Sequence, residues 1–314
     1  MARRVLIAGA TGQIGELLTP ALVAVGDEVF GLARSGHSAE KVRELGATPV
    51  VGDALDRDAV MSAVAEAKPD VIVHQLTAIP RSGINPRKMG EAFGPTTRLR
   101  RDGTRYLVDA AEQQGVRRVV AQSIAFGYRH EGPEILDESA PLDTDAAGAW
   151  AEIVGGVAAL EEAVLGGSAF EGVVLRYGMF YGPDTAYSPN GYYGEMVTKR
   201  RLPIIGDGNG RQSFIQMDDA VSATLAAIDR GSGVYNVVDD EPARAREWIP
   251  GLADALGAKP PRHAPAWLAR LAAGSAAVRA MTTQRGASNA RIKQELGWEP
   301  RYADWRGGFP TLTA

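Results

Sequence analysis

Short apolar runs recur along the chain, and the longer segments between them carry apolar residues at a helical spacing. The helical pattern is clearest over residues 57–67, where apolar positions three and four apart fall on one face. The runs contain almost no polar positions, which is typical of strands covered on both faces of a sheet. The predicted strands are Val5–Ala8, Glu28–Ala33, Pro49–Val51, Val71–His74, Val119–Ala121 and Gly172–Leu175. Their alternation with helices predicts a parallel sheet with right-handed crossovers.

The alternation ends near Tyr177 and divides the chain into two parts. Residues 1–177 are predicted to form a doubly wound α/β domain. Residues 178–314 start with a stretch rich in glycine and proline, which indicates loops. We interpret this part as mainly a smaller, substrate-binding lobe, with some segments returning to the first domain. Short amphipathic helices are expected in its tail, around residues 247–256, 265–273 and 289–296.

A glycine-rich turn joins the first predicted strand to the first helix. Gly9, Gly12 and Gly15 follow Val5–Ala8 directly and precede the helical pattern of residues 16–25. This order of strand, glycine turn and helix is typical of a Rossmann-type dinucleotide site, where the pyrophosphate meets the positive end of the helix dipole. We therefore expect the first domain to bind a dinucleotide. The contacts would come from Gly9, Thr11, Gly12, Gln13 and Ile14.

The end of the second predicted strand indicates which dinucleotide is bound. Sites for NAD usually place an acidic residue there to hold the ribose hydroxyls, whereas NADP sites accept an arginine. Here the strand ends at Ala33 without an acid, and Arg34 and Ser35 follow. A guanidinium group and a hydroxyl are suited to a 2′-phosphate. The sequence thus favours NADP over NAD, although Arg34 could also be a surface residue of the loop.

The overall composition narrows the choice of partners. The net charge is -4 and there are no cysteines and four histidines. An acidic balance does not favour nucleic acid or an anionic membrane, and the absence of cysteine removes thiolate chemistry and cysteine-based zinc sites. No apolar run approaches the length of a membrane span. We expect a cytoplasmic protein that binds a small-molecule substrate and no metal.

The ordered motifs resemble those of the extended short-chain dehydrogenase/reductase family, also called the NAD-dependent epimerase/dehydratase family. The likeness runs from Val5 to about Phe309. After the glycine turn, the matching segments are Gly52-Asp53, His74, Gly103-Thr104, Leu175–Pro183, Gly206–Gly208, Arg211–Asp219, Tyr235-Asn236 and Glu295–Trp298. The resemblance implies that Asp53 faces the adenine amino group with Ala54 beside it, and that Tyr177 lies by the nicotinamide. It also implies that Gln75, Leu76 and Thr77 line the ribose and pyrophosphate.

The Tyr-x-x-x-Lys pair that moves the proton in this family is missing. No tyrosine of the chain has a lysine four residues later, and the helix that should carry the pair offers Ile153 and Val157. Arg100 stands at the family's usual asparagine position. The serine position falls on Ile124, with Ser123 beside it.

Other polar groups are expected near the end of the fifth strand and can take over the proton transfer. A reductase needs a bound hydride donor and one group that stabilises the developing oxyanion. Tyr128 or Ser123 is the predicted catalytic donor; water, another tyrosine or no acid at all are the alternatives. Tyr128 can equally be a packed tyrosine with its hydroxyl satisfied, and Arg100 can pair with an aspartate or hold a substrate anion.

Three functions fit these observations. The first is an NADP-dependent oxidoreductase that reduces a carbonyl or an activated double bond of a small molecule. Aromatic walls for this substrate are expected from Tyr187, Tyr192 and Tyr193. The second is a nucleotide-sugar epimerase or dehydratase, which the resemblance favours but the missing Tyr and Lys oppose. The third is a non-catalytic sensor that binds NADP. The helices over residues 95–114 and 150–165 make a homodimer plausible.

Overall fold

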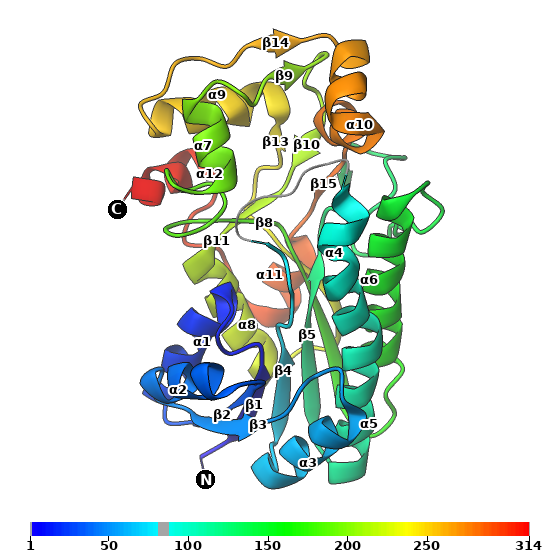
Figure 1. Ribbon diagram of the computed structural model, residues 1–314, viewed down its shortest axis with the longest axis vertical. Coiled ribbons are helices and arrows are strands. Elements are labelled where there is room, and N and C mark those ends of the chain that lie inside the picture. Colours follow the sequence, from blue (N-terminus) through cyan, green and yellow to red (C-terminus); the bar gives the residue numbers. More distant parts are fainter. Residues whose placement is uncertain (1, 81–87, 314) are drawn as a thin grey trace.

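A parallel sheet of seven strands forms the centre of the molecule (Figure 1). The computed structural model describes residues 2–80 and 88–313. The strand order across the sheet is β12-β7-β5-β4-β1-β2-β3. The strands are β1 (Arg4–Ala8), β2 (Glu28–Ala33), β3 (Thr48–Val51), β4 (Val71–His74), β5 (Arg118–Ile124), β7 (Glu171–Tyr177) and β12 (Gly233–Val237). The predicted doubly wound α/β fold is confirmed.

Helices cover both faces of this sheet, as the apolar strands require. One face carries α1 (Gln13–Ala24), α2 (Gly36–Glu44), α8 (Met217–Asp229) and α11 (Ala290–Leu296). The other carries α3 (Arg57–Ala67), α5 (Thr104–Gln114) and α6 (Ala149–Leu165). Next to α6 lie α4 (Met89–Arg98) and the π-helical turn η2 (Leu99–Gly103), which continue into α5 (Figure 1).

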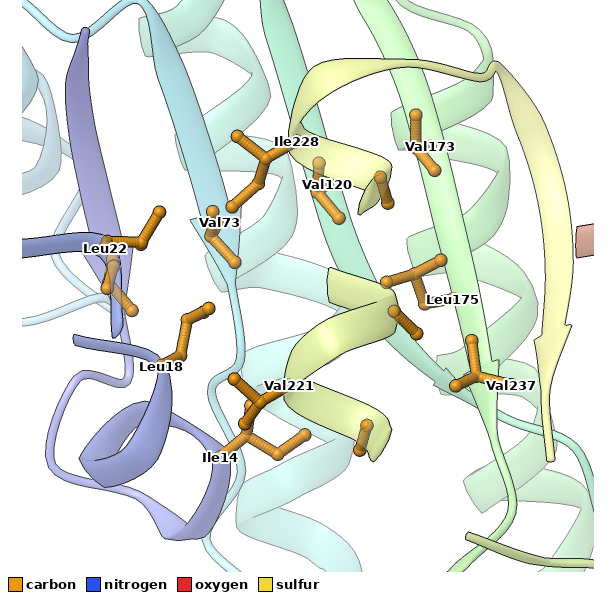
Figure 2. Close-up of a cluster of buried hydrophobic side chains, with 14 of the residues drawn as sticks. Ile14, Leu18, Leu22, Val73, Val120, Val173, Leu175, Val221, Ile228 and Val237 are labelled. Atoms are coloured by element: carbon orange, nitrogen blue, oxygen red, sulfur yellow. The ribbon is translucent and has the colours of Figure 1, made fainter. Parts of the chain in front are cut away.

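The side chains of β1 show why these strands are apolar throughout. Val5 and Ile7 pack in the cluster formed with α1 and α8, whereas Leu6 and Ala8 pack in the cluster on the opposite face. Successive residues of a strand point to opposite faces, so a strand covered twice has no solvent side. Figure 2 shows the first of these clusters, where residues of α1 face the strands and Val221 of α8.

The chain changes direction across the sheet between β1 and β4. The units that follow β1 build outward through β2 to β3, and β4 then returns to the other side of β1. A crevice opens at the carboxyl ends of the strands at such a point, and ligands of open α/β sheets bind there. The second lobe lies at the end of the molecule opposite the N-terminus (Figure 1).

The second lobe is built from short elements around its own apolar core. Its strands are β8 (Met179–Tyr181), β9 (Ile204–Ile205), β10 (Arg211–Gln212), β11 (Phe214–Gln216), β13 (Ala243–Arg244) and β14 (His263–Ala264), and β6 (Ile135–Leu136) pairs with β15 (Gly286–Ala287). Its helices are α7 (Tyr192–Thr198), α9 (Ala245–Ala255), α10 (Ala266–Thr282), α12 (Trp305–Gly308) and η3 (Phe309–Thr313). Beyond residue 177, α8, β12 and α11 belong to the layers around the central sheet.

Two of the three aromatic residues expected to line a substrate site, Tyr187 and Tyr193, belong to this core instead. Tyr187 is 2% exposed and stacks on Tyr193 with ring centroids 4.9 Å apart. Its ring also meets Phe214 and Trp248 edge to face. Burying these rings together stabilises a lobe whose strands are short. The expectation that Tyr187 forms a substrate wall is therefore wrong.

Candidate functional site

The glycine turn after β1 adopts a backbone that only glycine allows. Gly9 has a φ of 103°, and a Cβ added there would lie 2.9 Å from the backbone of Gln75 on the neighbouring strand. A Cβ on Gly15 would collide with the carbonyl groups of Gly9 and Ala10. The two glycines let the turn approach β4 and let α1 lie against the turn.

The first turn of α1 is left without a side-chain cap. Gly12 precedes the helix, and no side chain accepts from its first N–H groups. A Cβ on Gly12 would meet only the carbonyl oxygen of Gly9, at 3.3 Å. The cradle therefore fits a dinucleotide pyrophosphate, which the helix N-terminus attracts. Thr11 is half-buried in the turn, Ile14 packs in the core, and Gln13 Nε2 donates to the carbonyl of Asp184 at 3.2 Å.

Arg34 follows the end of β2 and is exposed. Its guanidinium forms no ion pair or hydrogen bond with any residue in the described ranges 2–80 and 88–313. Ser35 caps α2: its Oγ accepts from the backbone N–H of Ser38 at 3.2 Å. The end of β2 thus presents a cation and a helix N-terminus to solvent.

The residues expected around the adenosine lie at the ends of β3 and β4. Asp53 Oδ1 accepts from the backbone N–H of Leu55 at 2.9 Å, and Ala54 is buried beside it. Gln75 directly follows β4 and extends its hydrogen bonding to β1, because its backbone N–H donates to the carbonyl of Ala8 at 2.8 Å.

Gln75 also carries an unpaired polar atom at this edge of the sheet. Its side chain is 5% exposed, and its Oε1 is buried with no partner among the described residues. Leu76 follows, half-buried, and Thr77 is exposed. A buried carbonyl oxygen without a donor is costly, so the site has unused hydrogen-bonding capacity where the resemblance implies the ribose and pyrophosphate.

Tyr177 is fully buried and does not reach solvent. It is 1% exposed, and its hydroxyl lies 2.7 Å from Thr224 Oγ1 on α8 and accepts from Gln75 Nε2 at 3.4 Å. Burial raises the pKa of Tyr177 to about 12. Its predicted place beside a nicotinamide stays a prediction.

The two candidate proton donors are both held in one buried polar network. Ser123 Oγ donates to Glu161 Oε1 at 2.6 Å, and the hydroxyl of Tyr128 donates to Asn236 Oδ1 at 2.7 Å. Arg176 joins the two, since it forms a double hydrogen bond with Glu161 at 2.8 and 2.6 Å and donates to the Tyr128 hydroxyl at 2.9 Å. Every one of these side chains is buried.

Burial keeps Tyr128 protonated. Burial raises the pKa of its hydroxyl, and the opposing effect of the Arg176 charge is smaller. The Arg176 guanidinium also lies 4.9 Å from the centre of the Tyr128 ring. Because the hydroxyl proton is donated to Asn236, Tyr128 has no free donor for a substrate in this structure. Whether Tyr128 or Ser123 donates a proton stays a prediction.

The face of α6 that should carry the family's Tyr-Lys pair is aliphatic. Ile153 is 2% exposed and Val157 is fully buried. The next turn carries Glu161, the carboxylate of the network. The part of α6 nearest the sheet therefore supplies packing and one anion, but no acid or base that is free.

His74 closes β4 as a neutral, hydrogen-bonded core residue. Its Nδ1 accepts from the N–H of Leu76 at 3.2 Å, so its Nε2 carries the proton that reaches Thr104 Oγ1 at 2.9 Å. Burial, together with the nearby charge of Arg100, lowers its pKa to about 4. Arg100 is 3% exposed and lies on the π-helical turn η2.

A polar cavity of about 470 Å³ lies in the second lobe. Its lining includes four arginines, two of which already pair with a carboxylate: Arg211 Nη2 lies 2.5 Å and Arg244 Nη2 3.5 Å from Glu134 Oε2. The segment that carries Glu134 follows β5, and His130 on the same segment lies 3.0 Å from Thr283 Oγ1. The cavity is thus joined to the end of the sheet by one loop.

Sequence reasoning missed the two residues that complete the network. Arg176 lies in a strand that is otherwise apolar, and Asn236 lies in the last strand of the sheet. A charged residue inside a doubly covered strand needs a buried partner, so Arg176 was the available signal. Within the described ranges, no group of histidine and acidic side chains is placed to hold a metal ion. In that same part of the chain, none of the helices combines the length and apolarity of a membrane span.

Known proteins share the sequence pattern and the fold of this chain. The family described as NAD dependent epimerase/dehydratase matches residues 5–237. A Streptomyces protein named 3-diazoavenalumate denitrifying reductase is 47% identical over 308 residues, which cover 98% of this chain and 99% of the relative. A 2-alkyl-3-oxoalkanoate reductase of Stenotrophomonas maltophilia is 26% identical, with coverage of 81% and 76%. The NAD complex of the Thermus thermophilus UDP-glucose 4-epimerase superposes with a TM-score of 0.74 at 25% identity, covering 98% and 97% of the two chains.

Proposed function

This chain belongs to the NAD-dependent epimerase/dehydratase family and is an NAD(P)-dependent oxidoreductase, and from that premise we propose that it reduces a small organic molecule with NADPH. The substrate would carry a carbonyl or an activated double bond. A bound reduced nicotinamide supplies the hydride for such a reaction. The residues of this chain then have to bind the cofactor, orient the substrate and manage the proton.

The preference for NADPH is supported by the free cation at the end of β2. Arg34 is exposed and unpaired within the described residues, and the N-terminus of α2 lies beside it. A 2′-phosphate placed there would gain a charge-assisted hydrogen bond and the favourable end of a helix dipole. The remaining cofactor contacts that we propose are those of Gly9, Thr11, Gly12, Gln13 and Ile14. At the ends of β2, β3, β4 and β7 they are those of Ser35, Asp53, Ala54, Gln75, Leu76, Thr77 and Tyr177.

Net reduction is favoured over epimerisation by the state of the buried network. Oxidising a sugar hydroxyl requires a base that removes its proton, and both Ser123 and Tyr128 are already donating to buried acceptors. Hydride addition is less demanding, because water can protonate the product. We propose that the network fixes the shape of the site, and that Tyr128 and Ser123 act as positioning residues within this network.

The experiment measures NADPH consumption with a panel of ketones, aldehydes and enones. Loss of the reduced-nicotinamide absorbance with at least one substrate supports the proposal. Turnover of a nucleotide sugar without net loss of NADPH would point to an epimerase. Tight NADPH binding with no turnover of any compound would point to a sensor.

Replacing Tyr128 with phenylalanine decides the role of its hydroxyl. A positioning role predicts that kcat changes less than about tenfold, while the free energy of unfolding falls by about 1–3 kcal/mol because Asn236 and Arg176 lose a partner. A general acid typically contributes about 100-fold or more. A loss of that size in a variant that is still folded at the assay temperature would make Tyr128 the proton donor.

A second candidate substrate is a diazo-substituted aromatic acid. The Streptomyces relative that spans nearly the whole chain is named as a denitrifying reductase of 3-diazoavenalumate. Reductive loss of a diazo group also suits a site in which neither Ser123 nor Tyr128 has a free proton to donate. When hydride replaces the diazonium group of an arene, a C–H bond forms, the C–N bond breaks and dinitrogen leaves, so no proton is needed. Release of dinitrogen in step with NADPH consumption, from an arenediazonium substrate, tests this candidate.

A further inference from the structure

Arg100 is a buried cation without a hydrogen-bonded partner. It is 3% exposed, and within residues 2–80 and 88–313 its guanidinium forms no hydrogen bond or ion pair. The acid nearest to Arg100 in the sequence is Asp102, and it forms an ion pair with the exposed neighbour Arg101 instead. Arg101 Nε lies 3.0 Å from Asp102 Oδ1. Of the two alternatives for Arg100, pairing with an aspartate is therefore not seen among the described residues.

The surroundings of Arg100 are those of the candidate reaction site. Its charge acts on His74, at the carboxyl end of β4, and on Glu161 of α6, which accepts from Ser123 at the end of β5. The turn η2 that carries Arg100 packs directly on α6. A π-helical turn inside a long helix is often found at functional sites, and here it delivers a guanidinium to the edge of the sheet where the substrate would bind.

Among the described residues, no carboxylate at this edge is paired with Arg100. Glu161 is already satisfied, because both oxygens receive hydrogen bonds from Arg176 and one of them also from Ser123. His74 is neutral, with a pKa lowered to about 4, and burial lowers the pKa of Arg100 only to about 10, so Arg100 stays charged at neutral pH. Glu138, a second carboxylate beside the network, is half-buried, and its Oε1 accepts from the N–H of Asn236 at 2.8 Å. Neither Glu161 nor Glu138 forms an ion pair with Arg100. A buried charge without a paired opposite charge is unfavourable until an anion joins it.

We propose that Arg100 binds a carboxylate of the substrate and thereby selects acidic substrates for reduction. This rests on the proposed reductase function and adds the substrate class. A planar guanidinium matches a carboxylate with two parallel hydrogen bonds. The names of two relatives, 3-diazoavenalumate denitrifying reductase and 2-alkyl-3-oxoalkanoate reductase, denote carboxylate substrates, which supports the same class.

The test compares an acid with its neutral ester. The binding of 4-hydroxycinnamate and of its methyl ester to the full-length protein saturated with NADP⁺ is measured by calorimetry. The variants are Arg100→Gln and the matched control Arg101→Gln, which changes an exposed arginine on the same turn. We expect the wild type and Arg101→Gln to bind the acid at least tenfold more tightly than the ester, and Arg100→Gln to bind both equally.

Three results would overturn the proposal: equal binding of acid and ester by the wild type, an acid preference that survives in Arg100→Gln, or a loss of NADP⁺ affinity in that variant. The last would assign the charge to the cofactor. The melting temperature without ligand is a second readout. A structural role predicts a lower value for Arg100→Gln, whereas removal of an uncompensated charge predicts an equal or higher one. Neither readout needs turnover, so failure of NADPH consumption would count against the reductase function alone.

Discussion

The two halves of the candidate site are built by different means. At the cofactor half, around the turn between β1 and α1, glycines, backbone N–H groups and the exposed Arg34 shape the site. At the reaction half, where β4, β5 and β7 end, buried side chains far apart in the sequence share hydrogen bonds. The bond from Tyr128 to Asn236 spans 108 residues and the bond from Ser123 to Glu161 spans 38.

The two halves therefore respond differently to the replacement of side chains. A backbone cradle depends on the fold, so it persists when other side chains are replaced. Replacing one member of a buried side-chain network leaves its partners without hydrogen bonds, which makes the fold less stable than an apolar core would. The members of such a network therefore change together. Here Ile153 and Val157 occupy the helix face of the missing pair, while Arg176 and Glu161 tie the remaining polar groups together. On the proposed function, the cofactor half follows the pattern that the resemblance implies, whereas the reaction half departs from it.

The largest effect is expected from blocking the cradle. In Gly15→Val, the new side chain collides with the carbonyl groups of Gly9 and Ala10, so α1 must move away from the turn. We expect NADPH binding to be undetectable by calorimetry and the free energy of unfolding to fall by about 4 kcal/mol or more.

The matched control is Gly155→Ala on α6, where an added Cβ meets nothing within 4 Å. It should keep NADPH binding and gain about 0.5–1 kcal/mol of stability, as alanine does in a helix. If Gly15→Val bound NADPH like the wild type, the cradle would not depend on its glycines, and the contrast between the two halves would fail.

The halves also differ in how far they could be predicted from sequence. The sheet, the glycine turn and Arg34 follow from local patterns, since the strand, turn and helix lie next to each other in the chain. The network could not be predicted, because no local rule places Tyr128 beside Asn236 or Arg176 beside Glu161. The aromatic residues around Tyr187 were misassigned for the same reason: a cluster of rings is equally suited to a core and to a binding wall, and only the packing decides.

Breaking the network should come next in size. Arg176→Met removes the partner of a buried carboxylate, and such uncompensated charges cost about 3–5 kcal/mol. Urea unfolding of Arg176→Met measures the loss. The control Arg43→Met breaks an exposed pair with Glu40 and should cost less than about 1 kcal/mol. The double variant Arg176→Met/Glu161→Leu should recover much of the stability. Additive losses would instead mean that the two residues do not act as a pair.

The specificity of the cofactor half is tested at Arg34. Arg34→Ala should weaken NADPH binding by about 1.5–3 kcal/mol, the value of a lost hydrogen bond to a charged group, and leave NADH binding nearly unchanged. Fluorescence titration with both cofactors measures the two affinities. Because Arg34 is exposed and unpaired within the described ranges, its removal should not change the melting temperature. Equal weakening of NADPH and NADH would remove the argument for a 2′-phosphate contact.

The smallest effect is a dependence of stability on pH that arises at His74, between the two halves. Its pKa is about 4 in the folded protein and about 6.5 in an unfolded chain, because burial and the Arg100 charge oppose protonation. Between these values the unfolded chain binds the extra proton, so His74 makes the folded state less stable as the pH falls from 7 toward 4. At pH 5 this loss amounts to about 2 kcal/mol by linkage.

The contribution of His74 is isolated by comparing two variants across the same pH range. Other groups titrate there as well: burial also lowers the pKa of His130 to about 4, and it raises the pKa of Asp239, which has the opposite effect on stability. Urea unfolding of the wild type and of His74→Gln is measured at pH 7 and at pH 5. The contributions of His130 and Asp239 are common to both proteins and cancel in the comparison. The loss between the two pH values should be about 2 kcal/mol smaller in His74→Gln, whereas His37→Gln, at an exposed position, should match the wild type. An identical pH dependence in all three proteins would mean that His74 is accessible to protons in the folded state, and the buried half of the candidate site would then be open to water.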